Sequence, residues 1–149
     1  MIVGTWKDQQ DYDAHLAAAH TKQANAALGS HLIAPIDTHL GTQMIAQTLH
    51  APPTGSVYGI THIAVLPDKS DDMYAALIKY AAATRQAPGN LGYDPARDSS
   101  RSNHFSIVEI WKDQPAAEAY EAAVPSREFR AILAPITGPH YDRRWYKAL

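Results

Sequence analysis

The chain contains no cysteine among its 149 residues. This absence excludes disulfide bonds, thiolate nucleophiles, iron–sulfur clusters and cysteine-ligated zinc. The formal net charge is -2, so no basic excess is available for counterion release, and nucleic acid is not an expected partner. No apolar run reaches the roughly 20 residues that a membrane span needs. The first residues carry no charged-then-apolar signal pattern, and we expect a cytoplasmic protein without membrane contact.

Several cofactor motifs are also missing. No Gly-x-Gly-x-x-Gly follows a strand pattern, and neither a P-loop nor a Gly-x-Ser-x-Gly motif occurs. His15 and His20 are five residues apart, which places them about 140° apart around a helix, so they do not form an i, i+4 zinc pair. We expect no metal and no other cofactor. A basic cluster near the C-terminus, formed by Arg143, Arg144 and Lys147, is typical of a solvated strand face.

What the chain does have is an internal repeat. The segment IVGTWKDQ at residues 2–9 returns as IVEIWKDQ at residues 107–114. Each copy is followed by an Ala-rich stretch and then by Ala-Pro-Ile, at residues 34–36 and 134–136. A self-similar chain indicates one supersecondary unit used twice. Residues 57–106 precede only the second copy, so we expect a half domain followed by a complete one.

The spacing of apolar residues predicts the elements. In the N-terminal part we expect a strand at 2–6, a helix at 9–28 capped by Asp8 and Gly29, and a strand at 37–47. The Pro- and Gly-containing segment 50–56 is typical of a linker. After it, alternation and helical spacing predict strands at 57–66, 91–96, 105–111 and 140–146, with helices at 71–86 and 115–133.

The predicted order in residues 57–149 is β-α-β-β-α-β, which is typical of an α+β, ferredoxin-like fold. The N-terminal segment 1–49 matches the second half of that pattern. A half domain leaves apolar sheet surface and strand edges without partners. We therefore expect it to pack on its own chain or on a partner chain, and in either case we expect at least a homodimer.

The segment NHFSIVEIWKD at 103–113 resembles the antibiotic biosynthesis monooxygenase family, small dimeric α+β barrel proteins that include quinol monooxygenases. The segments THIAVLP at 61–67, TRQAPGN at 84–90 and GPHYD at 138–142 support the resemblance by their order and spacing. In the N-terminal copy, Trp6, His15 and His20 follow the family spacing of a strand Trp and two helix His. The complete copy has Tyr120 and Pro125 at the corresponding His positions.

The resemblance implies a cofactor-free oxygenase that acts on a small aromatic, quinol or polyketide-like substrate with O2. Two alternatives remain open: a non-catalytic protein that binds a small molecule in the inherited pocket, and a haem-binding relative from the haem-degrading branch. A cofactor-free oxygenase takes its electrons from a deprotonated substrate. It then needs a base, donors for the oxyanion and a dry aromatic pocket.

His104 and Asn103 are the candidate catalytic residues at a loop-to-strand junction, a place where functional side chains are common. His104 suits a general base near neutral pH, and the alternative is a structural, hydrogen-bonded His. Asn103 suits substrate orientation or donation to an oxyanion, and the alternative is capping of the loop.

Glu109 is the third catalytic candidate, because it lies among apolar neighbours on one strand face. Either it accepts a substrate proton, or it forms a salt bridge with Arg85 or Arg130. Phe105 and Trp111 share its strand face and are candidate substrate-binding residues, with core packing as the alternative for Trp111.

His62 and Tyr141 complete the candidate substrate-binding set. His62 lies on a strand expected to neighbour the 105–111 strand, where it is either a pocket base or a hydrogen-bonded sheet residue. Tyr141 begins the last strand, and we expect it mainly at a subunit or repeat interface.

Overall fold

The computed structural model describes residues 2–34, 36–47 and 51–147, without the side chains of residues 138–141. Two compact units divide between Thr38 and His39. The segment from His39 to Gln47, which the sequence groups with the half repeat, therefore lies in the larger unit. That residues 1–49 derive from half of a repeat stays a prediction.

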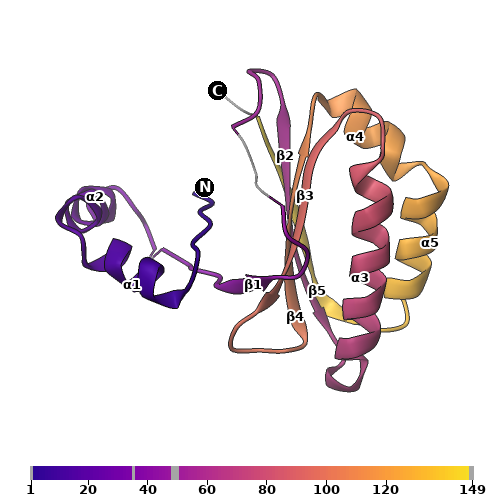
Figure 1. The fold of residues 1–149 in the computed structure, drawn as a ribbon, viewed down its shortest axis with the longest axis horizontal. Coiled ribbons are helices and arrows are strands. Elements are labelled where there is room, and N and C mark those ends of the chain that lie inside the picture. Colours follow the sequence, from indigo (N-terminus) through magenta and orange to yellow (C-terminus); the bar gives the residue numbers. More distant parts are fainter. Residues whose placement is uncertain (1, 35, 48–50, 148–149) are drawn as a thin grey trace. The chain divides into compact units, whose positions relative to one another are not determined.

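The larger unit is an antiparallel sheet with helices on one face (Figure 1). Its strands are β1 (Gly41–Gln43), β2 (Val57–Val65), β3 (Asn90–Asp98), β4 (His104–Trp111) and β5 (Thr137–Lys147), and its helices are α3 (Ser70–Arg85), α4 (Gln114–Glu121) and α5 (Val124–Leu133). A short 3-10 turn, Pro67–Lys69, connects β2 to α3. The predicted α+β, ferredoxin-like fold is confirmed.

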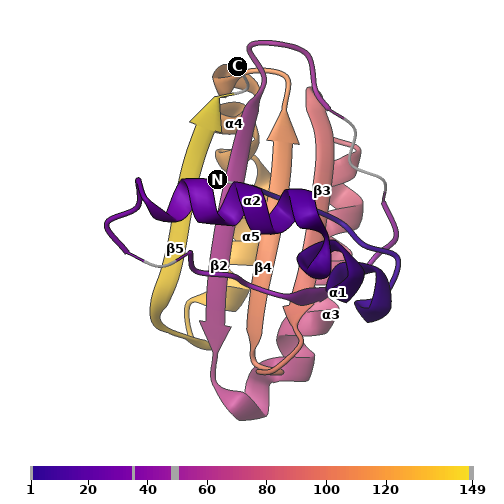
Figure 2. The same ribbon diagram turned by 90° about the vertical axis from the view of Figure 1, so that its left-hand side faces the viewer.

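The strand order among the described residues is β1-β3-β4-β2-β5. Figure 2 shows the four long strands in this order, with β2 and β4 in the middle. Every neighbouring pair is antiparallel, and Gly59 of β2 lies opposite Glu109 of β4 on one side and Trp145 of β5 on the other. The two central strands therefore position side chains that reach both outer strands.

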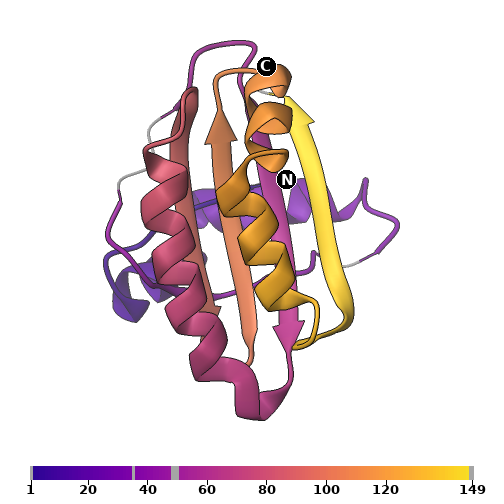
Figure 3. The same ribbon diagram turned by 90° about the vertical axis from the view of Figure 1, so that its right-hand side faces the viewer.

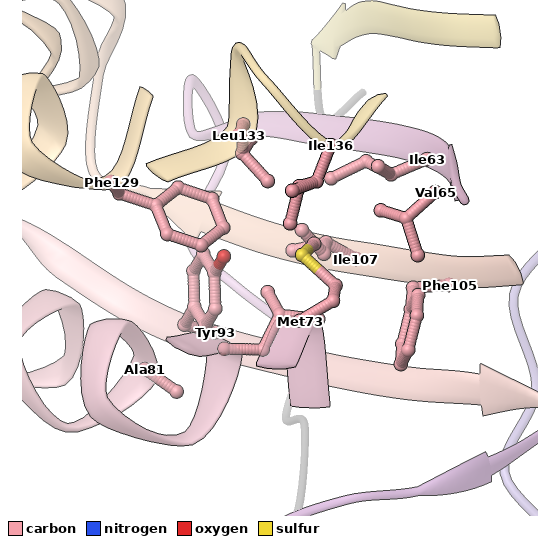
Figure 4. Packing of buried hydrophobic residues seen from close by; sticks show 11 residues of the cluster. Ile63, Val65, Met73, Ala81, Tyr93, Phe105, Ile107, Phe129, Leu133 and Ile136 are labelled. Atoms are coloured by element: carbon pink, nitrogen blue, oxygen red, sulfur yellow. The ribbon is translucent and has the colours of Figure 1, made fainter. Parts of the chain in front are cut away.

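Alternation along the strands divides the side chains between two faces, which we call the helix face and the far face. The helix face is covered by α3 and α5, which lie side by side (Figure 3). Its core combines the helix-side residues of the strands with Met73 and Phe129 of the helices. Figure 4 shows this packing, labelling Ile63, Val65, Met73, Ala81, Tyr93, Phe105, Ile107, Phe129, Leu133 and Ile136.

The C-terminal helical segment is two helices where the sequence predicts one. Pro125 lies in the first turn of α5, because a proline inside a continuous helix would lack its N–H donor and clash with the preceding turn. The Ser126 hydroxyl donates to the Tyr120 carbonyl at 2.7 Å and so satisfies the end of α4. Asp113 caps α4 by accepting a hydrogen bond from the Ala116 N–H at 2.8 Å.

The N-terminal unit differs more from its prediction. The expected strand at 2–6 is not formed, because within the described part of the chain no strand pairs with it. The expected helix is split into α1 (Gln9–Ala17) and α2 (Ala19–Gly29) by an extended Ala18. Asp8 caps α1 as predicted. At the start of the larger unit, the strand expected at 37–47 is reduced to β1.

Candidate functional site

The predicted site residues lie on both faces of one sheet. Glu109 and Trp111 point to the helix face, where Trp111 is 1 % exposed. His62 and His104 belong to the alternate positions and line a pocket on the far face. Because a sheet separates the two groups, one small substrate cannot contact both Glu109 and His104.

Glu109 is buried at the centre of the helix face. Its Oε2 accepts a hydrogen bond from the Trp111 indole N–H at 2.8 Å. Its Oε1 accepts from the Arg143 guanidinium at 2.5 Å. The carboxylate is 6 % exposed and Arg143 is 22 % exposed, so the ion pair is largely withdrawn from water and screened little.

The ion pair was predicted, but its predicted partners are wrong. Arg85 instead donates to the Tyr93 and Ile45 carbonyls at 3.0 and 3.2 Å. Arg130 donates to the Glu121 carbonyl at 2.9 Å. Both guanidinium groups therefore donate to backbone carbonyls near their own helices. The ion-pair partner of Glu109 is Arg143, which reaches it from β5.

Gly59 explains how Glu109 of β4 reaches Arg143 of β5 across the strand between them. A Cβ atom at Gly59 would lie 2.7 Å from both Cγ and Oε1 of Glu109, closer than non-bonded carbon atoms approach. The glycine leaves the space in which the carboxylate lies. Glycine inside a strand often marks a close approach of this kind.

Arg143 is a site residue that the sequence reading missed. The basic cluster was predicted to be a solvated face, which holds for Arg144, 68 % exposed and paired with Asp142 at 3.0 Å. Arg143 alternates to the opposite face, where it pairs with Glu109 and also with Glu121. Its guanidinium lies 4.6 Å from the centre of the Trp145 ring, a cation–π distance.

A pocket on the helix face surrounds this pair, and we call it the helix-face pocket. Its lining residues come from β2, β3, β4, β5 and the helices: Thr61, Ile63, Tyr80, Tyr93, Ile107, Glu109, Glu121, Ser126, Phe129, Arg130 and Arg143. Its inner space is about 30 Å³, whereas about 10–15 Å³ on this measure holds one water molecule. The inner space therefore has room for about two water-sized groups.

Tyr80 forms the aromatic wall of the helix-face pocket. Its ring stacks on Phe129 with centroids 4.2 Å apart and meets Tyr93 edge-on at 5.6 Å. Its hydroxyl shares a 2.9 Å hydrogen bond with the Ser126 hydroxyl. Burial, the largest cause, raises the pKa of Tyr80 to about 12. The phenol therefore stays neutral and acts as a hydrogen-bonding group at physiological pH.

The far-face pocket holds the two predicted histidines. His62 Nδ1 lies 2.9 Å from the Ser106 hydroxyl, and its ring stacks on His39 with centroids 4.3 Å apart. His104 lines the same pocket together with Asp98 and Arg101. The sequence did not single out His39, since it precedes the complete domain by almost twenty residues.

The other predicted site residues have structural surroundings. The Asn103 amide donates to the Val65 carbonyl at 2.7 Å, which ties the β3–β4 loop to the end of β2. Phe105 is 1 % exposed and belongs to the core between sheet and helices. The Tyr141 backbone pairs with Ile63, and its side chain lies outside the described part of the structure.

Tyr120, at the family His position, does not suit haem ligation. Its ring packs against Trp111 with centroids 5.1 Å apart, and its hydroxyl lies 3.0 Å from the Thr84 hydroxyl inside the core. Burial, the largest cause, raises the pKa of Tyr120, which disfavours a phenolate ligand. In the N-terminal unit the His15 ring lies tilted against the Trp6 ring, with centroids 4.3 Å apart.

Within residues 2–34, 36–47 and 51–147, no group of three or more His, Asp or Glu is arranged to hold a metal ion. In the same residues, no helix is both long and apolar enough to cross a membrane.

Comparison with known proteins identifies the fold of the larger unit. The family model described as antibiotic biosynthesis monooxygenase matches residues 56–134, which run from β2 through α5. The match does not include the N-terminal copy of the repeat. Among curated proteins, none matches this chain.

Solved structures agree with the family match. One named antibiotic biosynthesis monooxygenase is 20% identical, over 62% of this chain and 98% of its own, with a TM-score of 0.60. A protein of the same family name from Nitrosomonas europaea is 18% identical, over 65% of this chain and 93% of its own, with a TM-score of 0.62. A protein from Pseudomonas aeruginosa is 21% identical, over 67% and 98%, with a TM-score of 0.60. Identities this low show a shared fold and leave the activity open.

Proposed function

Because this chain belongs to the antibiotic biosynthesis monooxygenase family, we propose that it oxidises a small electron-rich aromatic compound, such as a hydroquinone or an anthrone, with O2 and without a prosthetic group. The deprotonated substrate supplies the electrons. One oxygen atom enters the substrate and the other leaves as water, so no external reductant is needed for a CH2 group that becomes a carbonyl. The protein's tasks are to take a proton, hold the resulting anion and exclude water.

The observation that carries this proposal is the Glu109–Arg143 pair in the helix-face pocket. A carboxylate and a guanidinium side by side can accept a phenolic proton and hold the phenolate that remains. Both groups are largely withdrawn from water, which strengthens their interaction with a developing charge. The neutral phenol of Tyr80 lies in the same pocket, where it donates to the Ser126 hydroxyl and supplies an aromatic wall.

In this proposal the inner part of the pocket holds dioxygen, and the aromatic ring lies further out, between α5 and Arg143. The inner space of about 30 Å³ is too small for a ring, since small-molecule sites usually enclose hundreds of Å³. Substrate binding therefore requires α5 to move outward from the sheet. The break between α4 and α5 at Ala122–Ala123 supplies a point for that movement.

The test is oxygen uptake with product analysis over a panel of hydroquinones and anthrones. We expect Glu109→Gln to lower enzyme-dependent uptake by about 10²-fold or more, the usual scale for loss of a general base. Glu118→Gln is the matched control, because Glu118 is an exposed carboxylate on α4. The Glu118→Gln variant should take up oxygen at the wild-type rate.

Two results would contradict this placement. Unchanged uptake in a folded Glu109→Gln variant would exclude Glu109 as the base. A loss of uptake in His104→Ala, with Glu109→Gln unaffected, would move the chemistry to the far face. Circular dichroism of each variant establishes that it is folded.

A non-catalytic binding function is the second candidate, and one observation favours it. Both carboxylate oxygens of Glu109 already accept hydrogen bonds, from Trp111 and Arg143, as in a purely structural ion pair. A ligand from the same panel that raises the thermal midpoint without oxygen uptake above the autoxidation control would support this function.

We also propose at least a homodimer. The N-terminal unit exposes large apolar side chains, and Ile2 and Ile33 are 85% and 107% exposed, which is typical of a surface that packs against another chain. Light scattering at micromolar concentration is expected to give at least twice the 16.3 kDa mass of one chain. A monomer mass would contradict the proposal.

A further inference from the structure

We propose that Glu121 is a positioning residue of the helix-face pocket, which holds the Arg143 guanidinium in place beside Glu109 and links that ion pair to the movement of α5. The inference deepens the proposed function and rests on it, because it concerns how the same pocket opens and how its ion pair is placed. In this proposal Glu121 does not touch the substrate and acts through Arg143.

The Arg143 guanidinium is held at two of its nitrogen atoms by two different carboxylates. Its Nη2 donates to Glu109 Oε1 at 2.5 Å, and its Nη1 donates to Glu121 Oε1. A guanidinium is planar and rigid, so contacts at two different nitrogen atoms fix its direction, whereas a single contact lets it turn. Glu121 therefore determines which way Arg143 faces in the pocket that all three residues line.

The two carboxylates differ in their exposure to water. The Glu109 side chain is 6 % exposed, whereas that of Glu121 is 39 % exposed. Water and salt screen an exposed ion pair far more than a buried one, so the Glu121 contact is the weaker of the two. It can therefore break and form again while the buried contact between Arg143 and Glu109 persists.

Glu121 also lies at the point where the pocket is expected to open. It is the last residue of α4, directly before the break at Ala122–Ala123. Its backbone carbonyl accepts a hydrogen bond at 2.9 Å from the guanidinium of Arg130, a residue of α5. The carbonyl of Glu121 thus binds α5, while its carboxylate binds Arg143 of β5. An outward movement of α5 therefore acts directly on the contact between Glu121 and Arg143.

Opening and closing of the pocket are in this way coupled to the position of Arg143. The outward movement of α5 that admits the substrate breaks the exposed Glu121 contact. The return of α5 over the substrate restores that contact and brings Arg143 back to the position in which it holds the phenolate beside Glu109. Closure that completes a site only after the substrate has entered also keeps water out during the reaction.

The tryptophans allow this positioning to be measured without turnover. The chain has three of them, and two contact the ion pair. The Trp111 indole N–H donates to Glu109 at 2.8 Å, and the Arg143 guanidinium lies 4.6 Å from the centre of the Trp145 ring. Trp6 belongs to the N-terminal unit and serves as the reference. The experiment records the three indole N–H signals of the full chain by NMR.

We expect Glu121→Gln to shift the Trp111 and Trp145 signals and to leave the Trp6 signal in place. Glu118→Gln is the matched control, because it makes the same change of charge at an exposed position of the same helix, and it should shift none of them. Salt at about 1 M, where the screening length falls to about 3 Å, should move the wild-type signals towards those of Glu121→Gln. The variant itself should hardly respond, which a merely structural role of Glu121 would not explain.

Arg130→Met tests the link to α5. We expect it to shift the Trp111 and Trp145 signals in the same direction as Glu121→Gln does, because α5 then no longer holds the end of α4. Arg127→Met is the matched control, since Arg127 is another exposed arginine of α5, and it should leave both signals where they are.

Oxygen uptake supplies the second readout. We expect Glu121→Gln to lower kcat by about two- to fivefold, the factor that corresponds to the loss of one exposed ion pair. KM should not rise, because the pocket opens more readily. Unmoved Trp111 and Trp145 signals in Glu121→Gln, equal shifts in Glu118→Gln, or a full salt response in Glu121→Gln would overturn the proposal. An absence of uptake by the wild type would contradict the proposed oxidation instead, and the NMR signals would then decide the role of Glu121.

Discussion

Replacing Trp111 with alanine is expected to lower the free energy of unfolding by about 3–5 kcal/mol, the usual loss for a large buried aromatic side chain. Trp111 is 1 % exposed and packs with Val57, Ala117 and Tyr120. The substitution leaves a cavity between β4 and α4. It also removes the indole N–H that Glu109 accepts at 2.8 Å. Urea unfolding followed by circular dichroism measures the change.

Two further variants separate these causes. Trp111→Phe keeps most of the apolar contact but removes the hydrogen bond, so we expect a smaller loss of about 1–3 kcal/mol. Trp6→Ala removes the tryptophan of the N-terminal copy, which is 42% exposed, and should cost about 1 kcal/mol or less. If Trp111→Ala cost no more than Trp6→Ala, Trp111 would not be part of the core.

The sheet was the most predictable part of the molecule. Strands β2 and β4 are rich in apolar residues, and their buried positions alternate with less buried ones over part of their length. The predicted strand at 57–66 differs from β2 by a single residue. Alternation is a local property of the sequence and needs no knowledge of distant contacts. The order β-α-β-β-α-β then restricts the topology to few choices, which is why the ferredoxin-like fold was predicted correctly.

The positions at which the predicted helices break into two were harder to predict. Pro125 is a visible signal that the helix breaks between α4 and α5, because a proline is tolerated only in the first turn of a helix. The break at Ala18 has neither proline nor glycine beside it, so nothing in the residue pattern indicates it. The strand expected at 2–6 failed for another reason: its residues suit a strand, but a strand also needs a neighbour.

The sequence was enough to predict which residue types form the site, but not which residues pair with one another. Glu109 among apolar residues correctly indicated a buried, paired carboxylate. Its partner depended on which strand lies two positions away in the sheet, and that is a long-range property. Gly59 was the residue that could have indicated Arg143. A glycine in the middle of a strand often marks a place where another group approaches the backbone closely. Here that group is the Glu109 carboxylate, which extends across β2 towards β5.

The second large effect is expected from Arg143→Met, which should lower the free energy of unfolding by about 3–5 kcal/mol, because it leaves the Glu109 carboxylate buried without its cation. Glu121→Gln removes the other carboxylate beside Arg143. Since Glu121 is 39% exposed, water screens its pairing, and we expect a loss of about 1 kcal/mol or less.

A double-mutant cycle with Glu109→Gln tests whether this loss comes from the ion pair itself. If it does, Arg143→Met should cost less when Glu109 is already glutamine, because no buried charge is then left unpaired, and the coupling energy should be about 0.5–3 kcal/mol. If the two losses simply add, Arg143 stabilises the fold through its packing on Trp145 and not through Glu109. In that case the pair would have no electrostatic strength to offer a substrate anion, and the proposed use of the helix-face pocket would fail together with the ion pair.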